Sequence, residues 1–317
     1  MRFYLGTHQP AWLSRDLGVP LLVSHRRLAG RRTLPRATSP WACDSGGFSE
    51  LSLYGEWRTD ARAYDAAVRR YSEEIGNLDW AASQDWMVEP HVRARTGASL
   101  RTHQHRTVTN YLRLRELAPE LPFIATLQGQ SVSDYQRCAD LYERHGVDLA
   151  ALPRIGVGSI CRRQHSGEVE QIVRSLAGRG LRLHTFGAKV LGLARYADAI
   201  CSSDSLAWSF RGRHVPGCSP SHRSESNCVH FALAWHTRLL ASLPADTGDD
   251  HDRPEPRQPV TSLPTTRSVR ARGREPRPHR ASAPVRPATR TRRERSTTSD
   301  SPLAAAVSRP HRTRSRP

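Results

Sequence analysis

The sequence has no uninterrupted run of about 18 apolar residues, the length that a membrane-spanning helix needs. Its first residues lack the basic and then apolar layout of a secretory signal. Lysine is nearly absent, since Lys189 is the only one among 48 basic residues, and the six cysteines are scattered. These absences argue against a membrane protein and a disulfide-rich secreted protein, and we expect a cytoplasmic one.

Positive charge is concentrated in the last part of the chain. The 317 residues carry a net charge of +18 from 48 basic and 30 acidic residues. Residues 253–317 hold 17 arginines and four acids, which give +13 and leave +5 for the preceding 252 residues. The extreme basicity is therefore mostly a property of the terminal segment.

From about residue 246 the chain is rich in Pro, Arg, Ser and Thr and nearly free of aromatic and branched apolar residues. Such a segment buries too little surface to offset the entropy lost on ordering. We therefore expect a folded domain over residues 1–245 and a disordered basic tail over residues 246–317. Dense arginine favours a nonspecific tether to nucleic acid, and an inert low-complexity extension fits the sequence equally well.

Short apolar runs alternate with longer helical patterns in the first domain. The runs predict strands at residues 3–6, 20–23, 41–43, 78–82, 123–127, 154–157, 181–186 and 199–202. Helical patterns lie at residues 61–75, 99–117, 133–145, 167–178 and 188–196. This alternation predicts an α/β protein with a parallel sheet, and eight strands favour a (β/α)₈ TIM-like barrel. Residues 25–40 give no clear helix, and a doubly wound open sheet is the alternative.

Polar residues follow several of these strands, where a barrel places its chemistry. The acids are Asp44, Asp85 and Asp204, and Gln128 follows a fourth strand. Each alone fits an ordinary turn or helix cap. Together they offer a nucleophile, a proton acceptor and hydrogen-bonding partners for a flat heterocycle.

The motifs around these residues resemble those of the tRNA-guanine transglycosylases, which are (β/α)₈ enzymes. The matching segments are DSGGF at residues 44–48, QGQ at 128–130, GVGS at 156–159 and SSDSLAWS at 202–209. In detail the chain is more similar to a divergent branch, the DpdA-type transglycosylases that insert 7-deazaguanines into DNA. That similarity is carried by LGTHQPAWL at residues 5–13 and by the segments at 95–117, 156–164 and 184–193, and it spans residues 3–240.

The resemblance implies exchange of guanine for a 7-deazaguanine in DNA. Asp204 matches the nucleophile, which forms a covalent glycosyl-enzyme, and Asp44 matches the general acid/base. Asp85 matches the acid that reads the guanine edge. The other substrate-binding positions that the resemblance implies are Ser45, Gly46, Gln128, Gly156 and Gly158.

The chain also departs from the tRNA enzymes. Where bacterial members carry a Glu facing an aminomethyl group, this sequence has Ser159, which favours 7-cyano-7-deazaguanine. The CxCxxC zinc cluster is absent and the folded part is shorter. DNA is therefore the favoured partner, with helper proteins of a DNA-modification system possible. The same reaction on tRNA, and an inactive nucleic-acid-binding barrel, are the alternatives.

Cysteine and histidine gather in a segment at residues 214–240. Cys218, His222 and Cys228 are spaced as tetrahedral zinc ligands can be, and the resemblance implies a structural zinc in this region. The fourth ligand is left open among His214, His230 and His236.

Arginines near the predicted strand ends offer contacts to phosphate. One group lies at residues 93–115, where a solvated helix face is the alternative, and Arg162, Arg163 and Arg211 lie near other strand ends. The target guanine must leave the base stack to reach the nucleophile, and Phe48 and Trp86 are candidates to stack on it unless they belong to the core.

Overall fold

The computed structural model describes residues 1–220 and 222–243, and the predicted tail at 246–317 lies outside them. Eight parallel strands form a closed barrel in chain order. Their bounds are β1 Arg2–Thr7, β2 Leu21–Ser24, β3 Trp41–Asp44, β4 Leu78–Ala82, β5 Phe123–Leu127, β6 Ile155–Val157, β7 Leu183–Thr185 and β8 Ser202–Ser205. The first strand pairs with the last, with Tyr4 opposite Asp204, so the predicted barrel is confirmed and the open sheet is excluded.

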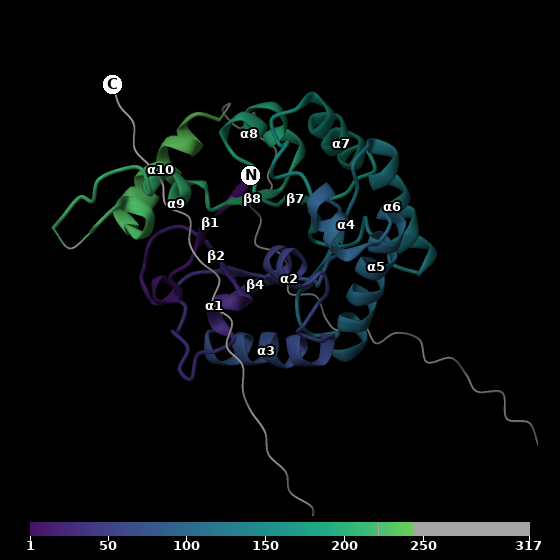
Figure 1. Cartoon of the computed structure of the whole chain (residues 1–317), viewed down its shortest axis with the longest axis horizontal. Coiled ribbons are helices and arrows are strands. Elements are labelled where there is room, and N and C mark those ends of the chain that lie inside the picture. Colours follow the sequence, from purple (N-terminus) through teal and green to yellow (C-terminus); the bar gives the residue numbers. More distant parts are fainter. Residues whose placement is uncertain (221, 244–317) are drawn as a thin grey trace, which may run out of the picture. The chain divides into compact units, whose positions relative to one another are not determined.

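Helices surround the strands (Figure 1). The α-helices are α1 His25–Leu28, α2 Gly47–Tyr54, α3 Ala61–Glu74, α4 Pro90–Thr96, α5 Leu100–Leu117, α6 Val132–Arg144, α7 Gly167–Ala177, α8 Val190–Tyr196, α9 Ala207–Gly212 and α10 Val229–Ala241. Short 3₁₀ helices are η1 Pro10–Ser14, η2 Ala197–Ala199 and η3 Glu225–Asn227. Within the part of the chain that the structure describes, no helix is both long and apolar enough to cross a membrane.

Serine caps fix the starts of three of the long helices. The side chains of Ser99, Ser131 and Ser166 accept hydrogen bonds from backbone amides in the first turns of α5, α6 and α7. Such caps satisfy amides that have no partner within the helix. The five predicted helices accordingly match α3, α5, α6, α7 and α8 to within a few residues.

Alternate side chains of the strands enter two separate apolar regions. Phe3 and Leu5 of β1 belong to the large core between strands and helices, whereas Tyr4 belongs to a small cluster inside the barrel. That inner cluster includes Trp80 and Ile124, with Phe186 packed against it. Its aromatic side chains fill the barrel interior, so chemistry is confined to the end where the strands finish.

The predicted bounds of the last strand, residues 199–202, are wrong. Residues 197–199 form η2, and β8 begins only at Ser202, so Asp204 lies within the strand and not after it. A run of Ser-Ser-Asp-Ser has no apolar signature. It is nevertheless buried, because its side chains find hydrogen-bond partners inside the barrel and on β7.

Candidate active site

Asp204 is held by two hydrogen bonds to one carboxylate oxygen. Its Oδ1 accepts from the Gly187 amide at 3.1 Å and from His184 Nε2 at 3.2 Å. Burial lowers the pKa of His184, so its ring is neutral near pH 7 and one nitrogen donates while the other accepts. No hydrogen bond from the described residues reaches Oδ2 of Asp204, which leaves that oxygen available to react.

Hydrogen bonds that involve Ser202 and Arg154 fix the orientation of the His184 ring. Its Nδ1 lies 2.9 Å from the hydroxyl of Ser202, and Arg154 Nε donates to that same hydroxyl at 3.1 Å. A neutral ring that accepts from Ser202 at Nδ1 carries its hydrogen on Nε2, the atom that faces Asp204. His184 is therefore a positioning residue for Asp204, a role that the sequence alone did not indicate.

Asp44 ends β3 and lies near enough to Asp204 to interact with its charge. Its Oδ2 accepts from the Gly46 amide at 3.1 Å. Burial raises the pKa of Asp44 and the charge of Asp204 raises it further, against the hydrogen bonds from Ser24 and Gly46. Gly46 has a φ of +84°, and a Cβ there would lie 2.8 Å from Arg26 Cγ, so glycine is required at this turn.

Asp85 follows β4 and completes a group of three carboxylates. Burial raises the pKa of Asp85 to about 7, and the charges of Asp44 and Glu89 contribute to this rise. Gln128 donates from Nε2 to its Oδ2. Asp44 thus interacts electrostatically with both Asp85 and Asp204, which means that side chains from β3, β8 and the loop after β4 lie near one another at this end of the barrel.

A buried line of polar side chains leads away from Asp85. After Gln128 comes Ser159, whose Oγ lies 2.6 Å from Gln128 Oε1 and 2.8 Å from Glu89 Oε2. These contacts fix which way the Gln128 amide points. A Cβ at Gly158 would lie 2.2 Å from Gln128 Nε2, so the glycine makes room for the amide. Sequence analysis missed Glu89, which is 70 residues from Ser159 in the chain.

The remaining predicted substrate positions have different surroundings. Ser45 is buried within the turn after β3. Gly156 lies under Phe186, because a Cβ there would be 2.4 Å from Phe186 Cε2. This gives Gly156 a packing role, and its contact with a base stays a prediction. Phe186 stacks edge-on against Trp80 and His184, and it offers a partly exposed aromatic surface beside the carboxylates.

The predicted arginine group at residues 93–115 does not form one surface. Arg113 and Arg115 lie in the last turns of α5, far from the strand ends, where they bind Glu116 and backbone carbonyls. Arg106 stacks on Trp86 with its guanidinium carbon 4.3 Å from the ring centre. Trp86 is therefore 9% exposed and closed to a base, whereas Phe48 is 46% exposed and remains a candidate for stacking.

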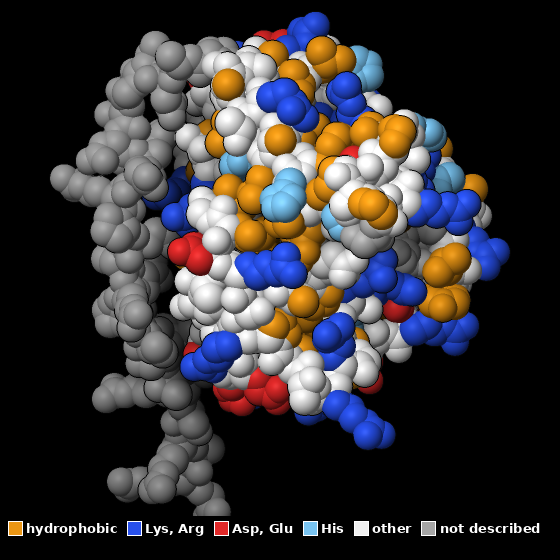
Figure 2. Space-filling model, turned by 90° about the vertical axis from the view of Figure 1, so that its left-hand side faces the viewer, with side chains coloured by type: hydrophobic (Ala, Val, Ile, Leu, Met, Phe, Trp, Pro, Cys, Tyr) orange, Lys and Arg blue, Asp and Glu red, His pale blue; other side chains and the backbone are white. Residues whose placement is uncertain are grey.

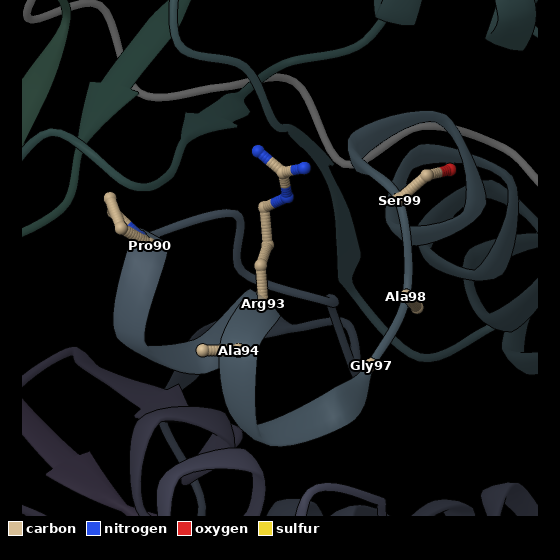
Figure 3. A pocket seen from close by; sticks show the side chains of 6 residues that line it. All are labelled: Pro90, Arg93, Ala94, Gly97, Ala98 and Ser99. Carbon is tan, nitrogen blue, oxygen red and sulfur yellow. The ribbon is translucent and has the colours of Figure 1, made fainter.

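Arg93 projects into a hollow of about 550 Å³ between α4 and the start of α5. Figure 3 shows its side chain rising between Pro90 and Ser99. The Nε atom of Arg93 is buried and has no hydrogen-bond partner in the described part of the chain. Arg93 is thus the member of the predicted group that lies in a hollow near the strand ends.

A second group of polar side chains lies beyond α9. Cys218, His222, Glu225 and Cys228 bring one ligand atom each to within 4.8 Å of one another. Cys218 Sγ lies 3.3 Å from His222 Nδ1 and 3.6 Å from Cys228 Sγ. The three predicted ligands do converge.

The fourth side chain of this group is Glu225, and none of the three candidate histidines belongs to it. His214 packs beside Phe210, with ring centres 5.8 Å apart. His236 is buried beside Phe3 of β1, with ring centres 5.6 Å apart. His230 lies on α10 outside the group. The sequence predicted a histidine as the fourth member of the group, whereas the structure places the carboxylate of Glu225 there.

Comparison with known proteins adds one finding to this geometry. Residues 1–253 match the protein family described as DpdA, DeoxyPurine in DNA protein A. The match covers the whole barrel and the segment that carries Cys218 and Cys228. A search of curated proteins gave no match.

Proposed function

Because the chain belongs to the DpdA family, whose members act in deazapurine modification of DNA, we propose that it exchanges guanine in DNA for a 7-deazaguanine. The observation that carries this proposal is the convergence of Asp44, Asp85 and Asp204 at the end of the barrel where the strands finish. Two carboxylates with different protonation can act as nucleophile and as general acid/base in one pocket.

In the first step Asp204 attacks the sugar. Oδ2, the oxygen without a donor, forms a bond to C1′ as the bond from C1′ to N9 of guanine breaks. The leaving base takes the bonding electron pair and receives a proton from Asp44, whose raised pKa favours the protonated acid. The product is a glycosyl ester on Asp204 and a free guanine.

In the second step the incoming 7-deazaguanine reverses this chemistry. Asp44, now ionised, takes the proton from N9 of the base, and N9 attacks C1′ as the ester bond to Asp204 breaks. Both carboxyl groups return to their starting states, so the cycle needs no other reactant. His184 and the Gly187 amide stabilise the released carboxylate through Oδ1.

Asp85 and Gln128 are proposed to read the base. An ionised Asp85 accepts from the ring N–H and the exocyclic amine of guanine, and the Gln128 amide donates to its carbonyl. Because Ser159 fixes the amide, a base with a different pattern leaves buried groups unpaired. The neutral Ser159 hydroxyl favours a 7-cyano group, although the carboxylate of Glu89 lies directly behind it.

The test is incubation of the purified protein with labelled 7-cyano-7-deazaguanine and either DNA or tRNA. We expect label in DNA, with one guanine released for each base incorporated. Label in tRNA alone would refute the DNA assignment, and label in neither polymer would refute base exchange. Preference for a 7-aminomethyl base would show that Glu89 and not Ser159 sets the choice.

The group around Cys218 is proposed to hold a structural zinc ion. Tetrahedral zinc places two thiolates about 3.8 Å apart and a thiolate and an imidazole about 3.5 Å apart. The separations of 3.6 Å and 3.3 Å agree with this geometry, and Glu225 supplies a carboxylate as the fourth ligand. A bound ion would add four bonds to the segment between α9 and α10, where Pro216 pairs with Ser224 and the Cys218 amide donates to Glu225.

We expect one zinc ion per purified chain. Replacing Cys228 by Ser should remove the metal and lower the melting temperature by several degrees, because zinc binding contributes to folding. Cys201→Ser is the matched control, since Cys201 lies outside the group and donates to the Leu183 carbonyl, as serine can. Metal analysis and thermal melting check this expectation. A wild-type protein that contains no metal, or a Cys228→Ser variant that melts at the wild-type temperature, would contradict it.

A further inference from the structure

A basic hollow of about 530 Å³ lies at the end of the barrel where β1, β2 and β8 finish. We call it the mouth groove and define it by six of its lining residues, Arg26, Arg27, Arg31, Arg213, His8 and Asn227. None of its lining residues in the described chain is acidic. Figure 2 shows the side of the molecule that bears α9 and α10, where Lys and Arg cover more of the surface than Asp and Glu.

Most of the charge in the mouth groove is uncompensated. Arg26 lies 3.4 Å from Glu50, but Arg27, Arg31 and Arg213 form no ion pair with the described residues. All four are exposed. Burial lowers the pKa of His8, and the charges of Arg27 and Arg213 lower it further. The positive charges of these two arginines therefore act on His8, which also lines the groove. An anion bound there would meet several donors and no carboxylate among the lining residues, and only Arg26 is shared with an acid, Glu50.

The mouth groove adjoins the pocket of the three carboxylates. Strand pairing sets the end of β2 beside Asp44 and β1 beside Asp204, and His8, Arg26 and Arg27 of the groove follow closely after β1 and β2. The side chain of Arg26 packs over Gly46, the residue that donates to Asp44. A sugar joined to Asp204 therefore brings its own phosphates to this side of the pocket.

We propose that the mouth groove binds the phosphodiester backbone of DNA next to the nucleotide whose base is exchanged, an inference that rests on the proposed function. Phosphate contacts position a nucleic acid while contacts to the base specify it, and the two tasks here fall to adjacent surfaces. Backbone contacts outside the pocket also supply the binding energy that draws a nucleotide out of the stack.

The experiment compares two triple variants of the full chain. One replaces Arg27, Arg31 and Arg213 by Gln, and the control replaces Arg15, Arg144 and Arg238, three exposed arginines outside the groove, by Gln. Both variants lose three positive charges, so any loss of DNA affinity that comes from net charge alone should be equal in the two. The readout is the affinity for a labelled DNA oligonucleotide over a series of salt concentrations.

We expect the groove variant to bind DNA at least tenfold more weakly and to lose about one unit of salt slope for each phosphate contact removed. The control should keep most of the wild-type slope. Equal affinities and slopes for the two variants would overturn the proposal. So would competition by polyglutamate that matches DNA in the wild type, because the groove would then be a site for acidic protein.

Binding and chemistry are measured separately on the same proteins. If the wild type exchanges bases but the groove variant binds DNA like the control, the groove proposal fails and the proposed function stands. If the wild type exchanges no base while the groove variant still loses its salt slope, the function fails and the groove stands. If both hold, the groove variant needs more DNA for half-maximal exchange, and its affinity for the free deazaguanine is unchanged.

Discussion

Replacing Asp204 by Asn is expected to reduce base exchange by a factor on the order of 10³ or more, because an amide cannot form the glycosyl ester. The change preserves volume, and an amide oxygen can still accept from His184 and Gly187. Binding of free 7-deazaguanine should therefore persist. Incorporation of labelled base measures the first effect and calorimetry the second.

The intermediate gives this prediction a second readout. Wild-type protein denatured during turnover should carry a covalent DNA adduct, detected by mass spectrometry, and the Asp204→Asn variant should carry none. Asp198→Asn is the control, since Asp198 is an exposed carboxylate paired with Arg174. A variant of Asp204 that exchanged bases at the wild-type rate would assign the nucleophile to another residue.

The affinity for free 7-deazaguanine is expected to depend on pH through Asp85. The pKa of Asp85 is raised to about 7 by burial and by the charges of Asp44 and Glu89. The base donates two N–H groups to the ionised carboxylate of Asp85. Below pH 7 the carboxyl group of Asp85 must therefore lose its proton before the base can bind. The dissociation constant should therefore rise about tenfold for each pH unit below 7 and level off above it.

Two variants sharpen the pH prediction. Glu89→Gln removes one negative neighbour, which lowers the pKa of Asp85 and shifts the break to lower pH. Asp85→Asn should bind on the order of 10–100-fold more weakly at pH 8 and show no break there, because charge-assisted hydrogen bonds are lost. Calorimetric titrations from pH 5.5 to 8.5 measure both. A wild-type dissociation constant that is flat over this range would contradict the assignment of Asp85.

The fold was predictable because most strands and helices of this barrel have strong local signatures. Buried parallel strands such as β5 are continuous apolar runs, and serine caps mark the starts of α5, α6 and α7. The last strand lacks such a signature. Its serines and Asp204 are stabilised by partners on β7 and by Arg154, just before β6, which lie 18 to 48 residues away in the sequence, so an apolar pattern cannot locate its start.

The residues of the candidate site likewise fall into two groups, those that sequence motifs predict and those that only the structure reveals. Asp44, Asp85 and Asp204 could be named from motifs, and in the structure Asp44 lies within electrostatic reach of the other two. The roles of Glu89, His184 and Glu225 could not be assigned, because each acquires its place through contacts with residues remote in the chain or through a loop whose path the sequence does not reveal. For Trp86 the sequence left open whether the ring stacks on a base or packs in the core, and the guanidinium of Arg106 covers the ring.

The pairing of β1 with β8 has a consequence during synthesis of the protein. Asp204, the proposed nucleophile, lies on the last strand of the barrel, and that strand is held between the first strand and β7. A nascent chain halted on the ribosome before Ser202 carries Asp44 and Asp85 but lacks Asp204. Under the proposed function, the order of the strands therefore supplies the nucleophile only when the barrel can close, so an incomplete chain would leave the glycosidic bonds of DNA intact.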